Sequence, residues 1–486
     1  MTYYFTNEIL HVIKNALPKD TSLFGDTPEL KYTYLPAGHA KALHPDSLLI
    51  VGIRGSGKSY WWSALQNEAH RSLIEKSLPN SGITKNSLVS LGFGEKPSPY
   101  DYPGKDLLVE LLKTFDARLI WRTIILMHLA KQLGTTTPLL DQKKWSDRLA
   151  WVRENPEESG QIAYEADNKL AREGNYHLIL FDALDRTVDD WKSMWQLVKG
   201  LLQVLLEFRF YKRIRPKAFV RPDHLEDPSV IAFPDSSKIS IIELNWPRNE
   251  LYGLLWQYLA NAENGKLFVK GCQEGYDINW PTQTSIIQEI PAILRRDEEV
   301  QRSVFHAITG PWMGGDRRRG FPYTWLPNHL GDTRRQVSPR SFLAAMRHAA
   351  EDDSKANHKY AIHYESIKRG VQEASKIRVR EMQEDYPWVE SLLEPLAGLS
   401  VPCPFKDISD RWKENQTLKN LQTNVKRDNI RLPPSQLGSG AEGVRKDLEN
   451  LALFERMNDD RVNLPDVYRV GYGIGRRGGV KVVARS

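Results

Sequence analysis

Short apolar runs alternate with stretches of helical periodicity between residues 47 and 260. Five of these runs have the length and composition of buried strands. The expected strands cover residues 47–51, 87–92, 176–181, 216–220 and 239–244. Strands that alternate with helices form parallel sheets with crossover helices. The pattern therefore predicts an α/β domain around a five-stranded parallel sheet.

The clearest helix in this region follows the third strand. In VDDWKSMWQLVKGLLQVLLEF, apolar residues recur three and four positions apart, as they do on one face of a helix. The segment 103–174, between the second and third strands, is an unusually long connection that also has helical periodicity. We expect it to pack on the sheet rather than to form a domain of its own.

Outside this region the pattern is mainly helical. A short amphipathic helix is expected over 7–15, and another helix begins with Ser338 as N-cap and Pro339 in its first turn. A long charged helix is expected over 361–384. Helices near 405–415 and 441–450 then precede a hairpin around 457–461, and helices followed by a hairpin outline a winged helix.

These segments predict an α/β fold with a P-loop core, a helical lid and a C-terminal winged-helix domain. The expected parts are an N-terminal helix and connection (1–40), the core (41–260), the lid (261–355), and the long helix with the winged-helix-like domain (356–486).

Composition narrows the class of protein. Of 486 residues, 41% are hydrophobic and 26% are charged, which is typical of a globular protein, and no apolar run reaches 18 residues. The first residues lack a basic segment followed by an apolar one. Cys272 and Cys403 are the two cysteines, so a cysteine metal site is excluded and a reducing compartment is favoured. We expect a cytoplasmic protein without a membrane partner.

The charge of the chain is uneven. The formal net charge is only +6, but five basic residues follow Asp466 against that single acid. They are Arg469, Arg476, Arg477, Lys481 and Arg485. Such a tail either binds nucleic acid or is a solvated end, and the charge alone leaves both open.

The strongest chemical signal is GIRGSGKS, residues Gly52 to Ser59, which matches G-x-x-x-x-G-K-[ST] after a strand and before a helix. Glycines let backbone N–H groups wrap a phosphate, and a helix N-terminus adds positive charge. Lys58 then reaches the β- and γ-phosphates, and the Ser59 hydroxyl is a Mg²⁺ ligand. The expected nucleotide-binding residues are Gly52, Arg54, Gly55, Ser56, Gly57, Lys58, Ser59 and Tyr60. Two tryptophans, Trp61 and Trp62, follow, and we expect them to be packing residues.

A second signal is YHLILFDALDRT, in which a buried strand ends in Asp182 and Asp185 lies three residues later. A carboxylate at the end of a central parallel strand is where a Mg²⁺ site is expected beside a P-loop. Asp185 is a candidate to orient or deprotonate the attacking water. A helix N-cap acid is the alternative interpretation.

These motifs together resemble the AAA+ and STAND groups of ATPases. The resemblance implies that Arg221, at the end of the fourth strand in KAFVRPD, senses the γ-phosphate. The segment SPRSFLAAMRHA is similar to the sensor-2 helix of origin-recognition initiators, which implies that Arg340 faces the nucleotide. Either arginine could instead be an ordinary surface residue. An arginine finger acting on a neighbouring subunit is a further possibility for the arginine-rich loop before this helix, which carries Arg317, Arg318, Arg319, Arg334 and Arg335.

The resemblance implies a Mg²⁺-dependent ATPase that switches conformation or assembles into homo-oligomers. Since no Asp-Glu pair ends the third strand, slow hydrolysis is expected. ATP is favoured over GTP partly because no N-K-x-D motif is present. We expect control of a separately encoded effector, as in bacterial anti-phage defence. The alternative is a DNA-binding initiator or loader that grips double-stranded DNA with the winged helix.

The winged-helix segment itself bears on this choice. Its second helix, AEGVRKDLEN, carries three acids against two basic residues, which disfavours phosphate contact. We therefore favour packing within the protein or docking of a partner. The basic tail GRRGGVK keeps DNA contact open.

Overall fold

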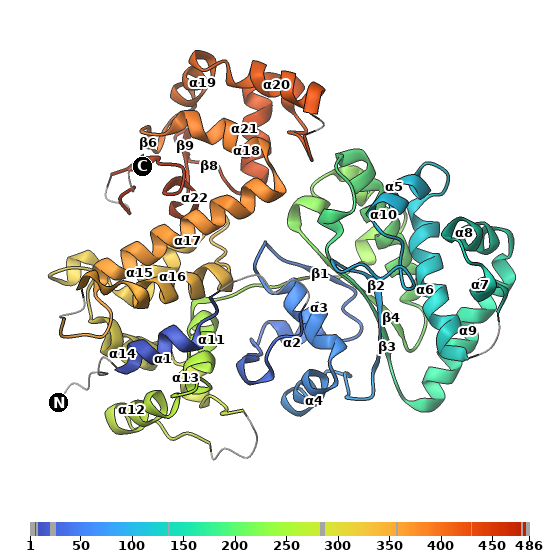
Figure 1. The fold of residues 1–486 in the computed structure, drawn as a ribbon, viewed down its shortest axis with the longest axis horizontal. Helices are drawn as coiled ribbons and strands as arrows, with labels where there is room; N and C mark the ends of the chain where they lie inside the picture. Colours follow the sequence, from blue (N-terminus) through green and yellow to red (C-terminus); the bar gives the residue numbers. More distant parts are fainter. Residues whose placement is uncertain are drawn as a thin grey trace. The chain divides into compact units, whose positions relative to one another are not determined.

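The computed structural model divides the chain into two compact units (Figure 1). Unit 1 comprises Met1–Ser22, Glu29–Pro36 and Asn245–Ser486, and unit 2 comprises Leu23–Pro28 and Ala37–Leu244. The residues that the structure describes are 5, 8–19, 26–134, 137–281, 287–355, 358–428, 430–477 and 480–482.

Unit 2 is built on a five-stranded parallel sheet in the order β2-β3-β4-β1-β5. The strands are β1 (Leu49–Val51), β2 (Leu88–Phe93), β3 (His177–Phe181), β4 (Ile214–Val220) and β5 (Ile241–Glu243). All five predicted strands are confirmed to within two residues. Because β4 lies between β3 and β1, the residues that follow these three strands emerge side by side at one edge of the sheet.

The register shows how these strand ends align. Val51 of β1 lies opposite Val220 of β4, and the next amide, that of Gly52, donates a hydrogen bond to the Val220 carbonyl (3.1 Å). Phe181 of β3 lies opposite Ala218 of β4. The first residue of the phosphate loop, Gly52, is therefore in register with Arg221. Asp182 is in register with Phe219, two residues before Arg221 along β4.

Unit 2 also contains helices that precede and follow β3 in the sequence. They are α2 (His39–Leu43), α3 (Lys58–Gln66), α4 (Glu68–Ser77), α5 (Lys105–Leu112), α6 (Ala117–Leu133), α7 (Pro138–Asp141), α8 (Trp145–Glu154), α9 (Pro156–Glu173) and α10 (Trp191–Phe208).

The long connection before β3 is helical and packs on the rest of unit 2, as predicted. Trp121 of α6 donates a hydrogen bond to the Leu197 carbonyl of α10 (2.9 Å), and its ring meets Phe181 edge-on. The two helices approach closely at Gly200, where a Cβ would lie 2.6 Å from the Arg118 amide nitrogen.

Unit 1 has a helical core. Its helices are α1 (Glu8–Ala16), α11 (Arg248–Ala260), α12 (Lys266–Tyr276), α13 (Ala292–Arg296), α14 (Glu298–Thr309), α15 (Pro322–Leu330), α16 (Pro339–Glu351) and α17 (Tyr364–Asp385). Ser338 is the N-cap residue of α16, as predicted, although its side chain makes no capping hydrogen bond. The predicted helix over 7–15 corresponds to α1, and Asn7 lies outside the described residues.

The boundary between the units differs from the sequence expectation. The core was expected to extend to residue 260, whereas unit 2 ends at Leu244 and α11 belongs to unit 1. The reason is that α11 is buried on nearly every side. Its Tyr252 and Trp256 join an aromatic cluster with Phe268, Phe305 and other residues of unit 1. Helical periodicity does not reveal which domain such a helix packs against.

The C-terminal part of unit 1 contains the predicted winged helix. Its elements are β7 (Cys403–Pro404), α19 (Phe405–Glu414), α20 (Thr417–Asp428), α21 (Gly440–Asn450), β8 (Glu455–Arg456) and β9 (Arg461–Asn463). The three strands form an antiparallel sheet in the order β7-β9-β8. Helix α20 was not expected from the sequence. Around this module lie α18 (Trp388–Leu393), α22 (Asp466–Arg469) and a parallel pair, β6 (Ser400–Val401) with β10 (Gly475–Arg476).

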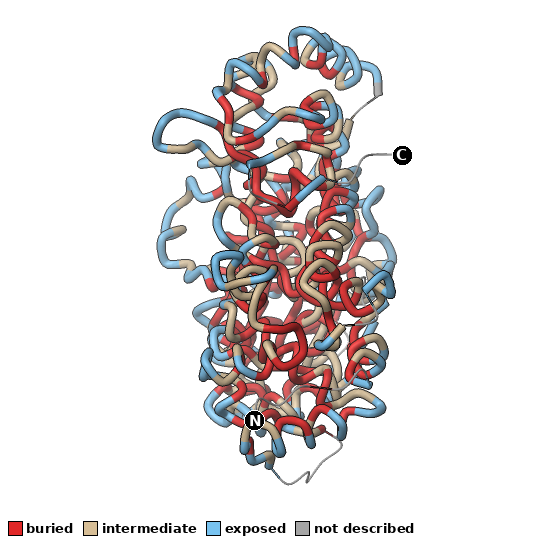
Figure 2. The backbone as a smooth tube through the Cα atoms, turned by 90° about the vertical axis from the view of Figure 1, so that its left-hand side faces the viewer, coloured by how far each residue is buried: buried red, intermediate tan, exposed pale blue. Residues whose placement is uncertain are grey.

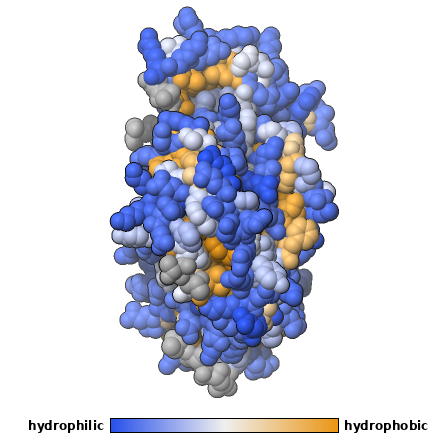
Figure 3. Space-filling model, turned by 90° about the vertical axis from the view of Figure 1, so that its right-hand side faces the viewer, coloured by the Kyte–Doolittle hydropathy of each residue, from blue (hydrophilic) through white to orange (hydrophobic). Residues whose placement is uncertain are grey.

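Burial follows these elements. Figure 2 colours each residue by its burial, and the exposed residues gather on outer turns. The face drawn in Figure 3 is largely hydrophilic, with separate apolar areas between charged side chains. Among the described residues, no helix is long and apolar enough to cross a membrane.

Candidate phosphate site

The loop between β1 and α3 has the conformation that its glycines permit. Gly55 and Gly57 adopt positive φ angles of 78° and 104°, which side chains disfavour. At Gly52 a Cβ would lie 2.2 Å from the Ser56 Oγ, so the loop leaves no room for a side chain there. Helix α3 begins at Lys58, and the Trp61 amide bonds the Gly57 carbonyl (3.0 Å). The predicted phosphate loop therefore leads directly into a helix N-terminus.

Lys58 lies across this loop. Its Nζ donates hydrogen bonds to the carbonyls of Gly52 (2.7 Å) and Ile53 (3.0 Å). Burial and, to a smaller extent, the charge of Arg221 lower the pKa of Lys58 to about 8, although nearby acids oppose this shift. The ammonium is thus held close to a second cation, an arrangement that an anion would relieve.

Asp182, the residue after β3, is buried and accepts a hydrogen bond from the Ser59 side chain. Burial raises the pKa of Asp182 to about 6, although Ser59, Lys58 and the Ala183 amide oppose that rise. The two residues expected to hold Mg²⁺ therefore lie together. No cluster of three His, Cys, Asp or Glu side chains suited to a metal ion occurs among the described residues. A serine, one carboxylate and phosphate oxygens are a donor set that fits Mg²⁺.

Asp185 lies in the 3₁₀ turn Leu184–Arg186, which follows Ala183 in the left-handed conformation (φ 57°). Its charge acts on both Lys58 and Asp182. Arg186 anchors the turn through an ion pair with Glu95, just beyond β2 (2.7 Å). The second predicted acid is therefore close to the phosphate loop.

Arg221 follows β4 and is buried. Its Nε donates to Asp223 Oδ1 at 3.2 Å, and both side chains are only 10% exposed. Since Arg221 also acts electrostatically on Lys58, the structure brings the predicted sensor arginine to the loop.

Sequence reasoning missed two neighbours of Arg221. Asp223 positions the guanidinium, and His224 follows it as a fully buried side chain. The only sequence signal was their place directly after Arg221 in RPDH, where polar residues end a buried strand.

The tryptophans after the loop are packing residues, as expected. Trp61 and Trp62 are 2% and 3% exposed. The Trp61 Nε1 donates to His39 Nδ1 (3.0 Å), and Tyr60 meets the Trp61 ring edge-on. The Trp62 ring lies so close to Gly94 that a Cβ there would be 2.5 Å away. Their partners are thus α2 and the end of β2. Arg54 is partly exposed on the loop itself.

Arg340, the other predicted sensor, belongs to unit 1 and lies in the first turn of α16. Its Nη1 donates to Glu381 of α17 at 2.5 Å. Glu381 also pairs with Arg378 (3.1 Å), and Arg378 in turn donates to the hydroxyl of Tyr468 in α22. The guanidinium of Arg340 therefore has a carboxylate partner within its own unit, and its role toward nucleotide stays a prediction.

The arginine-rich loop is partly used in internal contacts. Arg318 pairs with Asp316 (2.9 Å), and Arg334 donates to the Asn450 carbonyl at the end of α21 (2.9 Å). Arg317 and Arg319 lie with Arg318 in one 3₁₀ turn, and Arg335 adopts a positive φ of 58°.

The winged helix carries its charges in pairs. Arg445 of α21 pairs with Glu442 and Glu449 of the same helix. In the hairpin, Arg456 pairs with Asp460 and Arg461 with Asp459. The two elements expected to face DNA are therefore neutralised by neighbouring acids.

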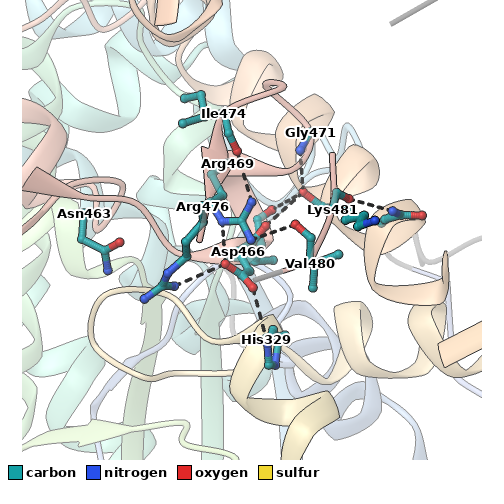
Figure 4. A network of polar contacts seen from close by, with 12 residues as sticks. His329, Asn463, Asp466, Arg469, Gly471, Ile474, Arg476, Val480 and Lys481 are labelled. Carbon is teal, nitrogen blue, oxygen red and sulfur yellow. Dashed lines mark hydrogen bonds and ion pairs between the residues drawn. The ribbon is translucent and has the colours of Figure 1, made fainter. Parts of the chain in front are cut away.

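Part of the basic tail is structural. Figure 4 shows Arg469, Arg476 and His329 converging on the Asp466 carboxylate. Arg469 is 1% exposed and also donates to the Ile474 and Val480 carbonyls. Arg477 and Lys481 are exposed, and Arg485 lies outside the described residues, as do Gly478 and Gly479.

Comparisons with known proteins give no family. No family model matches the chain, and no curated protein does. Two solved forms of the ORC2 protein of Aeropyrum pernix, one as ADPNP-ADP complexes and one in the ADP form, align with 92% of this chain and 94% of theirs. Their identities are 14% and 12%, with TM-scores of 0.31 and 0.32. Similarity at this level assigns no function.

Proposed function

We propose that unit 2 binds ATP with Mg²⁺ and hydrolyses it slowly, as a switch of the AAA+ or STAND type. The observation that carries this proposal is the convergence of Lys58, the Ser59–Asp182 pair and Arg221 at one edge of the parallel sheet. Glycine conformation, a helix N-terminus and two cations together suit a triphosphate.

The chain's own residues have distinct roles in this proposal. The loop amides and Lys58 bind the phosphates, and Ser59 with Asp182 holds the cation, which supplies charge neutralisation when bound. Asp185 orients the attacking water, and Arg221, held by Asp223, binds the terminal phosphate. Asp182 must be ionised to hold the cation, and Lys58 must be protonated to bind the phosphates. Nucleotide binding should therefore be strongest at a pH between their two pKa values.

Substitution of Lys58 tests the site. Lys58→Ala should lower triphosphate affinity and phosphate release by about 100-fold, because a charge-assisted donor is removed. Lys192→Ala, an exposed lysine of α10 in the same unit, is the matched control and should have no effect. Wild-type hydrolysis by Lys58→Ala would refute the proposal.

Turnover is tested separately from binding. Asp185→Asn should slow phosphate release at least tenfold while nucleotide affinity stays within about threefold. An unchanged rate would make unit 2 a nucleotide-binding scaffold without turnover.

A second candidate function is binding of double-stranded DNA by the winged helix, and the observation that favours it is the surface of α20. Lys419, Lys426 and Arg427 are exposed there, whereas α21 and the hairpin are neutralised. Replacing these three residues by alanine should flatten the salt dependence of binding to random duplex DNA. Lys270→Ala, at an exposed lysine of α12 outside the winged helix, is the control and should leave the salt dependence unchanged. If wild-type protein binds no duplex, the switch is left to act on itself as a homo-oligomer or on an effector protein.

A further inference from the structure

His224 is a polar residue beside Arg221, and the proposed mechanism gives it no role. It lies in the 3₁₀ turn Pro222–Leu225, directly after β4, and its amide bonds the Arg221 carbonyl (3.2 Å). Only 1% of the residue is exposed. The side chain is therefore fixed inside the protein at the same strand end that carries Arg221.

Neither ring nitrogen of His224 has a hydrogen-bond partner among the described residues. The other described histidines of unit 2 all have at least one polar contact. These are His39, His44, His70, His128 and His177. Buried polar groups normally form hydrogen bonds, because burying them without a partner costs free energy. Two ring nitrogens without a partner therefore indicate a hydrogen-bond partner that is not part of the protein.

The surroundings of His224 indicate the chemistry of that partner. Its charge state is coupled to Asp223, Arg221, Asp185 and Lys58, in that order of strength. The turns that carry Asp185 and His224 both pack against α10, which places them on the same side of the sheet edge. Burial lowers the pKa of His224, so the ring is neutral at neutral pH and presents one N–H donor.

A neutral donor has a specific use at this place. Lys58 and Arg221 already supply positive charge, and a third cation would repel both. A neutral imidazole N–H can bond a phosphate oxygen without adding charge, and it loses that partner when the terminal phosphate leaves.

We propose that His224 binds the terminal phosphate of the triphosphate through a ring N–H and so distinguishes ATP from ADP. This inference rests on the proposed nucleotide site, and it assigns to His224 a role in reading the nucleotide state rather than in overall affinity. The simpler alternative is that the ring only fills space beneath Arg221.

Three substitutions separate these roles. His224→Phe keeps the ring and removes both nitrogens, while His224→Asn and His224→Gln place an amide donor near the position of one or the other nitrogen. The measurement is equilibrium binding of ADP and of a non-hydrolysable ATP analogue with Mg²⁺, together with the thermal midpoint of each variant.

With His224→Phe we expect at least tenfold weaker binding of the analogue and ADP binding within about twofold of wild type. Either the Asn or the Gln variant should restore part of the difference. If His224→Phe keeps the wild-type ratio of analogue to ADP affinity, or lowers both equally, the inference is overturned while nucleotide binding stands. If wild-type protein binds neither nucleotide, both proposals are overturned.

Discussion

Two groups of charged residues in this protein differ in how their charges are balanced. In unit 1, Arg469 pairs with Asp466, and Arg340 and Arg378 share Glu381, all through direct contacts. In unit 2, the Lys58 Nζ donates to two backbone carbonyls, and the ammonium is repelled by Arg221.

The difference shows in the ionisation of the two groups. Burial lowers the pKa of Lys58 to about 8 and raises that of Asp182 to about 6, so both charged forms are disfavoured. Burial also acts to lower the pKa of Arg378, but Tyr468 and Glu381 more than offset it, and the pKa is raised. The unit 1 group stabilises its own charges, whereas the unit 2 group has charges that a bound ligand would stabilise.

Loss of Arg469 should have the largest effect on stability. Arg469→Met keeps much of the volume but removes the ion pair to Asp466 and two bonds to carbonyls. We expect a loss of about 3–5 kcal/mol in the free energy of unfolding of unit 1, since one partner of a buried pair is removed. Urea denaturation measures it.

The exposed Arg477 is the control for this substitution. Arg477→Met should change the free energy of unfolding by less than about 0.5 kcal/mol. Nucleotide affinity should be unchanged in both variants if the two groups are independent. A loss of nucleotide binding in folded Arg469→Met would contradict the comparison.

The pH dependence of nucleotide binding should be the next largest effect. Below a pH of about 6 Asp182 gains a proton, and above about 8 Lys58 loses one. Affinity for the Mg²⁺ complex should therefore fall on both sides, approaching tenfold per pH unit. Titration of binding from pH 5 to 9 measures it. Asp182→Asn should abolish the acid limb, and Lys58→Arg should abolish the alkaline limb, because arginine stays protonated.

The same pKa shift has an opposite consequence for stability. Because the folded form of Asp182 binds its proton more tightly than the ordinary value of 3.8 implies, the folded state holds more protons between about 4 and 6. Stability of the free protein from this group should therefore fall as pH rises through that range. An increase from this group would contradict the assignment.

Release of Arg340 should have the smallest effect. Glu381→Gln removes the negative charge that holds this arginine. If Arg340 senses the γ-phosphate, as the sequence predicts, triphosphate affinity should rise about three- to tenfold, because a competing carboxylate is lost. Glu373→Gln on α17, at a partly exposed acid paired with Lys376, is the control. Equal affinities in the two variants would leave Arg340 as a structural residue.

The sequence predicted those parts that depend on local pattern. The five strands follow from short apolar runs, and Gly52 to Ser59 is recognisable because the loop requires glycines at fixed spacing. Asp182 was found because it directly follows a buried strand, and Arg221 because the resemblance to AAA+ and STAND ATPases implies a sensor arginine at the end of the fourth strand. Each of these features can be recognised from residues that lie close to it in the sequence.

Contacts distant in the sequence were not predictable in this way. The Arg340–Glu381 pair joins residues 41 positions apart, and nothing in the pattern of α17 marks Glu381 among its other acids. Arg469 was counted as part of a basic tail because burial cannot be read from charge. Helix α20 was missed because its apolar positions are few, with Leu421 as its fully buried one.

The path of the chain through the two units has a consequence for biosynthesis. Helix α1 is translated before unit 2, yet its Ile9, Val12 and Ile13 are buried in a core whose partners include α11, α12 and α16. The sheet of unit 2 is complete once residue 244 has been made. During translation the apolar face of α1 therefore stays exposed until residues beyond 339 have been synthesised. A nascent chain with such an exposed face is the kind of species that chaperones bind.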